Sequence, residues 1–331
     1  MGKRHLRFAR EYIPNADIRV LRHEPSNIIP QYSNGSFSSI EEAILFSPQV
    51  AVIANPASYH VHIAYKLAEI GTHLLIEKPI SNNLDGLSEL IEICNKQNIC
   101  LLTGYNLRYL PSLSYFRDIL DKDIIGKVLS VRCEVGQYLP SWRVDSDYQK
   151  GVSAQKELGG GALLELSHEI DYLRWIFGEV KWVKASLSKQ SNLEIDVEDT
   201  AHIIMGFMPS STGHELIASV DLDFIRHDTS RLCTAIGENG SLQWNGLTGE
   251  VIIYESSSKS WHRLYSSAPQ QDESYIAEWK DFISCIRENK TPLISGEDGL
   301  KVMQIIEAVR KSSDIDRLIL DEIILKTNKG T

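Results

Sequence analysis

The sequence predicts an α/β fold in two parts, a doubly wound parallel sheet followed by an α+β part with a large, mostly antiparallel open sheet. Up to about residue 104, continuous apolar runs alternate with helical patterns, which is typical of parallel strands covered by helices on both faces. From residue 105 onward, strands alternate apolar and polar residues, as half-exposed strands do. The 331 residues suffice for about two domains, expected at 1–104 and 105–331.

In the first part, helices and strands are predicted both from helix-capping residues and from runs of apolar residues. In SSIEEAILF a serine cap precedes a glutamate at capping-box spacing, and Gly71 supplies a helix C-cap. The run VAVIAN is apolar almost throughout, which indicates a strand covered on both faces. Strands are therefore expected at 17–25, 50–55, 73–78 and 99–106, and helices at 38–46, 58–71 and 83–98.

Half-exposed strands dominate the second part, with few helices between them. The stretch GENGS has the composition of a hairpin turn. Strands are expected at 128–136, 180–189, 200–207, 215–224, 231–237, 241–246 and 250–256, and helices at about 161–177, 272–288 and 297–312. These helices cannot cover both faces of the sheet, so we expect a homodimer or homotetramer that associates through the open face.

The composition argues against several classes of partner. The net charge is −10 and no basic stripe accumulates, so nucleic-acid binding is not expected. No apolar run approaches the ~20 residues of a membrane span, and Met1 leads into charge rather than into a signal peptide. The five cysteines are scattered without metal-ligand spacing, which predicts a reducing, cytoplasmic location and no metal site.

Polar residues follow three of the predicted parallel strands, and ligands bind beyond the carboxyl ends of such strands. Glu77 and Lys78 would face a crevice there, with Pro79 restricting the backbone behind them. A lysine beside apolar surface loses its proton more readily, which suits proton transfer. The alternative is a surface Lys–Glu pair without a catalytic role. The three stretches are ANPASYH, EKP and GYNLRY.

A second motif, KELGGGALLELSHEIDYLRWIFG, places titratable residues on a predicted helix after a run of glycines. His168 with Asp171 one turn later resembles a general base and the carboxylate that orients it. Because a histidine on a helix is often structural, a packing role is the alternative. Helical spacing predicts that five residues share one face of this helix: Glu165, His168, Asp171, Tyr172 and Trp175.

Together these motifs resemble the Gfo/Idh/MocA family of oxidoreductases, as does the later stretch that begins SYIAEWKDF. The resemblance implies a Rossmann domain, a substrate domain, and hydride transfer between NAD or NADP and a sugar, polyol or sugar-nucleotide carbon. It implies that Lys78 and His168 carry substrate binding and proton transfer. Members often have an aspartate where this sequence has Leu164, so Glu165 or Asp171 is the expected partner of His168. This variant resembles members found near surface-polysaccharide genes.

Further site residues are expected from the same resemblance and from a long aromatic loop at 136–161. Arg22 could meet a 2′-phosphate and favour NADP, or it could be solvated. The loop side chains could stack on a sugar, or the loop could be a packed cover. The cofactor residues are Gly2, Lys3, Arg4, His5, Arg22, Asn55, Pro56, His60, Glu77, Lys78 and Asn106. The substrate residues are Lys78, Tyr105, Arg108, Trp142, Arg143, Asp145, Tyr148 and His168.

Gly2 resembles the last glycine of the G-x-G-x-x-G fingerprint, so the first strand and two glycines of the family pattern are not seen. Three interpretations are open. The start is truncated or misassigned, another segment or chain supplies the strand, or cofactor binding has been lost. The last interpretation leads to an alternative function, a non-catalytic sugar- or dinucleotide-sensing regulator. Retention of Lys78 and His168 argues for the enzyme.

Overall fold

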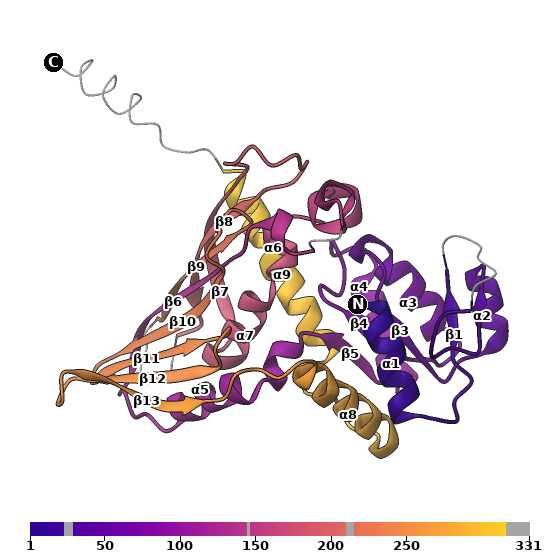
Figure 1. Cartoon of the computed structure of the whole chain (residues 1–331), viewed down its shortest axis with the longest axis horizontal. Helices are drawn as coiled ribbons and strands as arrows, with labels where there is room; N and C mark the ends of the chain where they lie inside the picture. The colour runs from indigo at the N-terminus through magenta and orange to yellow at the C-terminus, as the bar shows by residue number, and fades with distance from the viewer. Residues whose placement is uncertain (23–28, 144–145, 210–214, 316–331) are drawn as a thin grey trace, which may run out of the picture.

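The computed structural model describes residues 1–22, 29–143, 146–209 and 215–315, and it consists of a parallel part and a larger antiparallel part (Figure 1). In the parallel part, helices alternate with short strands, as the sequence predicts. Its elements are α1 (Gly2–Tyr12), β1 (Arg19–Leu21), β2 (Gly35–Phe37), α2 (Ile40–Phe46), β3 (Val50–Ile53), η1 (Ala57–Tyr59), α3 (His60–Ala68), β4 (His73–Glu77), α4 (Leu87–Lys96) and β5 (Leu101–Gly104).

The parallel strands form two separate sheets in the described part of the chain, whereas the sequence predicts one. β1 pairs with β2, and the second sheet has the order β3-β4-β5. Within the described ranges, β1 and β3 are each bonded along one side only. Glu77 at the end of β4 lies opposite Gly104 at the end of β5. The polar segments that follow these strands therefore start at one edge of the sheet.

The second part is built on an eight-stranded sheet whose order is β13-β12-β11-β10-β6-β9-β8-β7. All neighbours are antiparallel except β6 and β9, which confirms the predicted fold class. Its elements are η2 (Asn106–Tyr109), α5 (Pro111–Asp121), β6 (Val128–Gly136), η3 (Leu139–Ser141), η4 (Tyr148–Lys150), η5 (Val152–Ala154), η6 (Lys156–Leu158), α6 (Ala162–Glu165), α7 (His168–Phe177), β7 (Val180–Ser188), β8 (Thr200–Phe207), β9 (Ile217–Asp223), β10 (Ser230–Gly237), β11 (Gly240–Asn245), β12 (Glu250–Glu255), β13 (Ser260–Ser266), α8 (Glu273–Glu288) and α9 (Gly296–Ser313).

Local sequence signals explain where several helices begin. The Ser39 side chain accepts a hydrogen bond from the Glu42 N–H at the start of α2. Ser295 and Asp298 form a complete capping box at the start of α9. Pro111 occupies the first position of α5, where its missing N–H costs no helical hydrogen bond.

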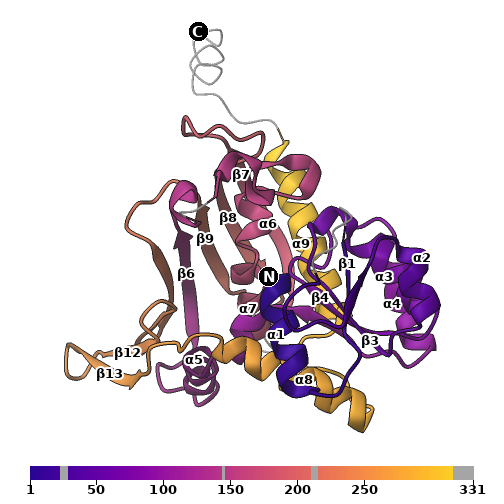
Figure 2. The same cartoon turned by 45° about the vertical axis from the view of Figure 1, so that its right-hand side comes forward.

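Helices cover one face of the large sheet. α9 lies along β7, α7 contacts β6, and α5 contacts β11 and β12. Figures 1 and 2 show these helices on the side of the sheet that faces the parallel part. No described helix lies on the opposite face in either view, as the sequence predicts for an open sheet.

Helix α8 belongs to the second part by sequence but packs against the parallel sheet. Phe282 and Cys285 form one hydrophobic cluster with Leu75 of β4 and Leu102 of β5. α3 and α4 contact each other, and α3 contacts the same sheet at β3 and β4. The carboxyl-terminal half of the chain therefore completes the core of the amino-terminal half.

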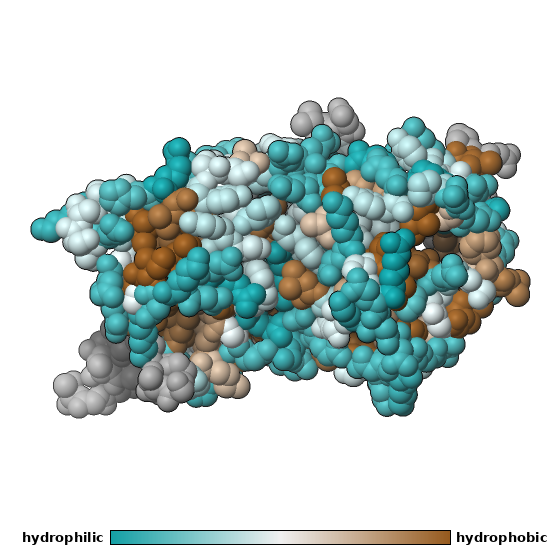
Figure 3. Space-filling view, turned by 90° about the horizontal axis from the view of Figure 1, so that it is seen from below, coloured by the Kyte–Doolittle hydropathy of each residue, from teal (hydrophilic) through white to brown (hydrophobic). Residues whose placement is uncertain are grey.

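The main hydrophobic core is continuous between the two parts. A single cluster of buried side chains extends from Ile53 and Leu74 in the parallel sheet to Val131 and Leu242 in the large sheet. Figure 3 shows that, on the underside, hydrophobic residues gather mainly toward the two ends, with hydrophilic surface between them. Within the described ranges, every helix is too short or too polar to cross a lipid bilayer.

Replacing Phe282 with alanine should lower the free energy of unfolding by about 3–5 kcal/mol, because it opens a cavity between α8 and the parallel sheet. Urea denaturation monitored by fluorescence measures this change. The control is Leu45→Ala at a side chain that is 86% exposed, which should change the free energy by no more than about 0.5 kcal/mol. Equal stability of the Phe282→Ala variant and the original protein would contradict the packing of α8.

Candidate active site

Lys78 reaches from the end of β4 to the second part of the molecule. Its Nζ donates a hydrogen bond of 2.7 Å to the main-chain carbonyl of Glu165, the last residue of α6. The side chain is partly buried, and the peptide bond to Pro79 is cis. The structure thus brings together the EKP segment and the glycine–histidine motif, which are 87 residues apart in the sequence.

Glu77 is buried, and each of its carboxylate oxygens has a hydrogen-bond partner. Oε1 lies 2.7 Å from Nε2 of His5, and Oε2 accepts a hydrogen bond of 3.2 Å from the Lys78 main-chain N–H. Burial by itself raises the pKa of Glu77, but the His5 hydrogen bond and the Lys78 charge outweigh it and lower the pKa. A Cβ added at Gly104 would lie 3.2 Å from Oε2, so glycine leaves room for this carboxylate.

His5 is held by protein groups at both ring nitrogens. The indole N–H of Trp279 lies 2.8 Å from Nδ1. Because an indole can only donate, Nδ1 accepts, and Nε2 carries the proton that is donated to Glu77. The sequence predicts His5 as a cofactor ligand, but its side chain is 2% exposed and both nitrogens are engaged. The structure therefore corrects this role: His5 supports Glu77.

The helix predicted at 161–177 is two helices, α6 and α7, because the chain leaves helical geometry at Leu166. Glu165 and His168 consequently do not share one continuous helical face. Ser153 donates a hydrogen bond of 3.0 Å to Oε2 of Glu165, while the Glu165 carbonyl accepts from Lys78. In this structure Glu165 supports Lys78, and its carboxylate is bonded to Ser153 rather than to His168.

His168 opens α7 and is buried beside Tyr105. The two rings meet edge to face with centroids 5.6 Å apart, and Nδ1 has no hydrogen-bond partner among the described residues. Burial, followed by the charges of Lys78 and Arg231, lowers the pKa of His168 well below the usual histidine value. The imidazole is therefore neutral at pH 7, which is the form that can accept a proton.

Asp171 is not placed to orient His168. Both of its carboxylate oxygens are occupied by the Arg108 guanidinium, at 2.9 and 2.6 Å, and both side chains are buried. Arg108, predicted as a substrate ligand, also lies 3.5 Å from Asp298. These two predictions are corrected, because the pair links η2 to α7 inside the protein and leaves neither charge free for a ligand.

The other residues of the predicted polar helix face are also engaged in packing. Tyr172 is fully buried, with its hydroxyl 2.9 Å from the thiol of Cys133. The Arg117 guanidinium lies over the Trp175 ring, 4.4 Å from its centroid. Residues 168–174 are all buried, so the predicted polar face of α7 is packed against protein over most of its length.

Residues predicted around the strand ends brace the backbone there. His60 is buried between the carbonyls of Asn55 and Pro79, at 2.8 and 3.0 Å. Asn106 directs its side-chain amide to the Ser274 hydroxyl at 2.7 Å, so α8 takes the contact predicted for the cofactor. The remaining members are Asn55, which is exposed, Pro56, which is half-buried, and Tyr105, whose hydroxyl donates to Ser167 at 3.2 Å.

The first residues at the amino end of α1 are exposed. A Cβ added at Gly2 would meet no atom within 4 Å. The Arg4 guanidinium donates a hydrogen bond of 3.5 Å to the Met1 sulfur, and it also lies 2.8 Å from Asp272 and 4.5 Å from the Tyr275 ring centroid. Lys3 is exposed, and Arg22 is half-buried beyond β1.

The loop before the glycine run packs mainly on its own neighbours. Trp142 donates to the Gln137 carbonyl at 3.0 Å, and the Tyr148 hydroxyl accepts from the Glu194 N–H at 3.3 Å. These contacts match the cover-loop alternative for the two aromatic residues. Arg143 is exposed. Asp145 lies outside the described residues, as do His23 and Glu24.

Sequence reasoning missed the contribution of α8. Ser274, Glu278 and Trp279 are buried, and they face η2 and α1. Both carboxylate oxygens of Glu278 are buried without a hydrogen-bond partner in the described part of the chain. Burial, and then the charge of Glu77, raise the pKa of Glu278 well above the usual glutamate value. The available signal was a glutamate four residues before Phe282, on the apolar face of the helix.

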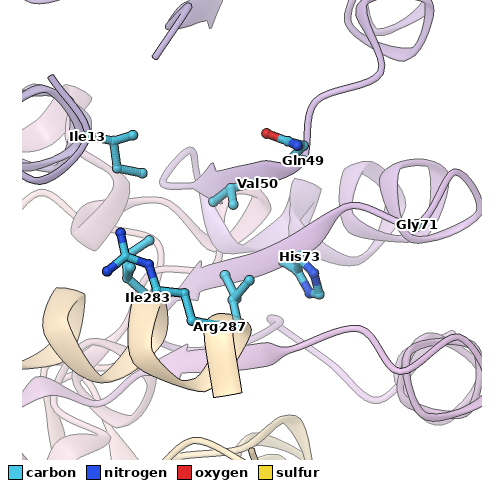
Figure 4. A pocket seen from close by; sticks show the side chains of 8 residues that line it. Ile13, Gln49, Val50, Gly71, His73, Ile283 and Arg287 are labelled. Carbon is cyan, nitrogen blue, oxygen red and sulfur yellow. The ribbon is translucent and has the colours of Figure 1, made fainter. Parts of the chain in front are cut away.

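A cavity of about 330 Å³ lies away from Lys78 and His168 (Figure 4). Val50 and His73, which line it, are the first residues of β3 and β4, whereas Glu77 is the last residue of β4. Ile13 and Ile283 close it from the sides of α1 and α8. Its largely apolar lining and its position at the opposite ends of the strands separate it from the candidate active site.

Comparisons with known proteins find one family model in each part of the chain. Residues 17–105 match a family model described as "Oxidoreductase family, NAD-binding Rossmann fold", and residues 117–319 match "Oxidoreductase family, C-terminal alpha/beta domain". The chain is 26% identical to the myo-inositol 2-dehydrogenase of Thermotoga maritima over 282 residues, which cover 82% of this chain and 80% of that protein.

Three further similarities were found, one to a curated sequence and two to solved structures. The chain is 31% identical over 150 residues to the levoglucosan dehydrogenase of Pseudarthrobacter phenanthrenivorans, covering 44% of this chain and 38% of that protein. A levoglucosan dehydrogenase structure with NADH and levoglucosan superposes with a TM-score of 0.81 at 23% identity, covering 95% and 94% of the chains. The WlbA dehydrogenase of Bordetella pertussis, solved with NADH and UDP-GlcNAcA, gives 0.75 at 18%, covering 94% and 92%. At these identities the structural matches establish the fold.

Replacing Glu278 with glutamine should make stability less dependent on pH. A raised folded-state pKa means that stability is complete below the unfolded glutamate pKa and is lost as pH rises toward the folded value. We expect the unfolding free energy of Glu278→Gln relative to the original protein to increase by about 1–3 kcal/mol between pH 5 and pH 8, as measured by urea denaturation. The exposed control Glu69→Gln should show no such trend, and a constant difference for Glu278→Gln would contradict a neutral buried acid.

Proposed function

The chain belongs to the oxidoreductase family that joins an NAD-binding Rossmann domain to a C-terminal α/β domain, and from this premise we propose that it is an NAD(P)-dependent dehydrogenase of a sugar-like alcohol. The supporting observation is the meeting of the Lys78 ammonium with the segment that carries His168. Lys78 is 2.7 Å from the Glu165 carbonyl, three residues before His168. A fixed ammonium and a neutral imidazole in one place suit proton transfer at a hydroxyl.

Each residue has a distinct role in this proposal. The bound nicotinamide supplies the hydride chemistry. The Lys78 ammonium hydrogen-bonds the oxygen of the reacting hydroxyl, and the Glu165 carbonyl keeps the ammonium in place. His168 accepts the hydroxyl proton in the oxidation direction, since its imidazole is neutral. Tyr105 packs against the imidazole ring and limits its rotation.

The residues at the strand ends fit a dinucleotide. A helix amino end attracts anions such as a diphosphate, and Gly2 at the start of α1 is exposed, with room beside its Cα. Ser58, which follows β3, has a buried hydroxyl oxygen without a partner among the described residues. We assign the amino end of α1 and the η1 segment to the cofactor. Arg22 does not decide between NAD and NADP, so both belong in the binding assay.

A sugar, a polyol or a sugar nucleotide is the substrate class we propose. The similarity to an inositol dehydrogenase and a levoglucosan dehydrogenase favours a cyclic polyol or sugar. The fold shared with a dehydrogenase solved with UDP-GlcNAcA keeps nucleotide-linked sugars, and with them surface-polysaccharide metabolism, in the proposal.

Lys78→Met and His168→Gln should each lower kcat by about 10²–10⁴-fold, the usual contribution of a positioned proton carrier. NAD(P)H absorbance with a panel of myo-inositol, levoglucosan, aldoses and UDP-sugars measures the rate. Lys122→Met, at an exposed lysine, is the matched control and should leave the rate unchanged. Cofactor binding by fluorescence runs in parallel. A full rate in Lys78→Met would refute its role, and absence of both NADH and NADPH binding would refute the dehydrogenase itself.

We also propose that two copies of the chain associate through the open face of the large sheet. Ile204 and Ile217 are 44% and 42% exposed on β8 and β9. Trp182 covers Gly206, which is paired with Ile217, so an apolar area extends across three strands. No described helix covers this face, and a second copy would remove these side chains from water.

Ile204→Arg combined with Ile217→Arg should convert the dimer or tetramer to a monomer, because both substitutions place a positive charge in the buried centre of the interface, where they repel each other. Light scattering after size-exclusion chromatography gives the mass. Leu45→Arg, on α2 in the parallel part, is the control and should keep the original mass. A monomeric original protein at all concentrations tested would overturn this arrangement.

A further inference from the structure

We propose that Trp279 and His5 are positioning residues for Lys78, acting through Glu77. The inference rests on the proposed function, because it assigns Lys78 to the reacting hydroxyl. It goes beyond that function in linking α8, at the far end of the sequence, to the lysine. Three side chains from three separate elements, Trp279, His5 and Glu77, form the connection in that order, and Glu77 then contacts the main chain of Lys78.

The first contact selects one form of the imidazole. The Trp279 indole N–H can only donate, and it lies 2.8 Å from His5 Nδ1. If Nδ1 carried a proton, its N–H and the indole N–H of Trp279 would both be donors and could not form a hydrogen bond. The indole therefore holds His5 as the neutral tautomer with its proton on Nε2. Both side chains are buried, so no water competes for these nitrogens.

The second contact directs that proton to Glu77. His5 Nε2 lies 2.7 Å from Oε1, and the carboxylate is 5% exposed. A buried carboxylate without a donor carries a large desolvation cost, so loss of this hydrogen bond would favour another rotamer or protonation. Gly104 leaves room for this position of the carboxylate, since a Cβ built there would lie 3.2 Å from Glu77 Oε2 and 3.1 Å from Glu77 Cα.

The last contact passes the constraint to Lys78. Oε2 of Glu77 accepts the Lys78 main-chain N–H at 3.2 Å, so the carboxylate orients the backbone from which the ammonium projects. The same histidine lies in the first turn of α1, three residues after Gly2. Trp279 therefore contributes to the orientation of Lys78. Through His5 it also positions the amino end of α1, which we assign to the cofactor, relative to the parallel sheet.

Two substitutions of His5 separate the two halves of this contact. In His5→Gln the side-chain amide nitrogen replaces Nε2 and keeps a donor toward Glu77. In His5→Asn the side-chain oxygen replaces Nδ1 and keeps the acceptor for Trp279, but Glu77 loses its donor. His62→Asn and His62→Gln, at an exposed position of α3, are the matched controls. Trp279→Phe removes the indole donor.

The loss in kcat should depend on whether each variant keeps a hydrogen-bond donor toward Glu77. We expect His5→Asn to lose about tenfold or more in kcat, the effect of one hydrogen bond to a charged group, with a smaller change in KM. His5→Gln should recover most of that loss, and Trp279→Phe should fall between them. Equal losses in His5→Asn and His5→Gln would indicate a packing role only and would overturn the proposal.

Two readouts do not depend on activity. Nitrogen NMR of the original protein should show a protonated Nε2 and an unprotonated Nδ1 in His5, and the opposite tautomer would overturn the proposal. The lowered pKa of Glu77 means that its stabilisation is present above the usual glutamate value and is lost as pH falls. The melting temperature of His5→Asn should therefore lie below that of His5→Gln at pH 7.5, and the gap should close toward pH 4.

The combination of readouts distinguishes the two proposals. If the tautomer and the pH-dependent gap are as expected but no substrate or cofactor is turned over or bound, the dehydrogenase assignment fails and the contact network stands. If turnover depends on Lys78 but His5→Asn matches His5→Gln in kcat and in melting temperature, the positioning role fails and the dehydrogenase stands.

Discussion

The buried carboxylate of Glu77 is the group on which the arrangement of the site depends. A charge that is 5% exposed must be paired, and its partners are His5 in α1, 72 residues earlier, and the main chain of the next residue, Lys78. Satisfying this one charge brings α1 to the edge of the parallel sheet, and the indole of Trp279 attaches α8 to the same point. The ammonium of Lys78 then extends toward α6 from a backbone that has little freedom.

The fold could largely be predicted because local patterns carry it. The expected bounds 128–136 and 200–207 agree with β6 and β8, where buried and exposed residues alternate regularly. β13 was missed because SWHRLYS is an edge strand with mostly exposed residues and no apolar periodicity. The separation of β1-β2 from β3-β4-β5 could not be read from residues, since strand pairing depends on which segments meet in space.

For the site, the sequence indicated the side chains that we propose as the reactive groups, but not their partners. Lys78 and His168 were found because their motifs are local and because strand ends collect ligands. Asp171 was assigned to His168 by helical spacing, yet its actual partner, Arg108, lies 63 residues away. The His5–Trp279 contact spans 274 positions. Spacing along one helix cannot predict contacts with a cation or an indole from another element. The partners of these residues could therefore be identified only from the three-dimensional structure.

Helix α8 has a consequence for how this architecture can be divided. A boundary near residue 105 is natural along the chain, but a fragment ending there would leave Leu75 and Leu102 uncovered, because Phe282 belongs to the other fragment. If recombination between relatives exchanged only the first hundred residues, the parallel sheet of one protein would have to pack against the α8 of another. The structural unit formed by the parallel sheet and α8 is therefore discontinuous in the sequence. A different large sheet could be acquired only by insertion between these two segments.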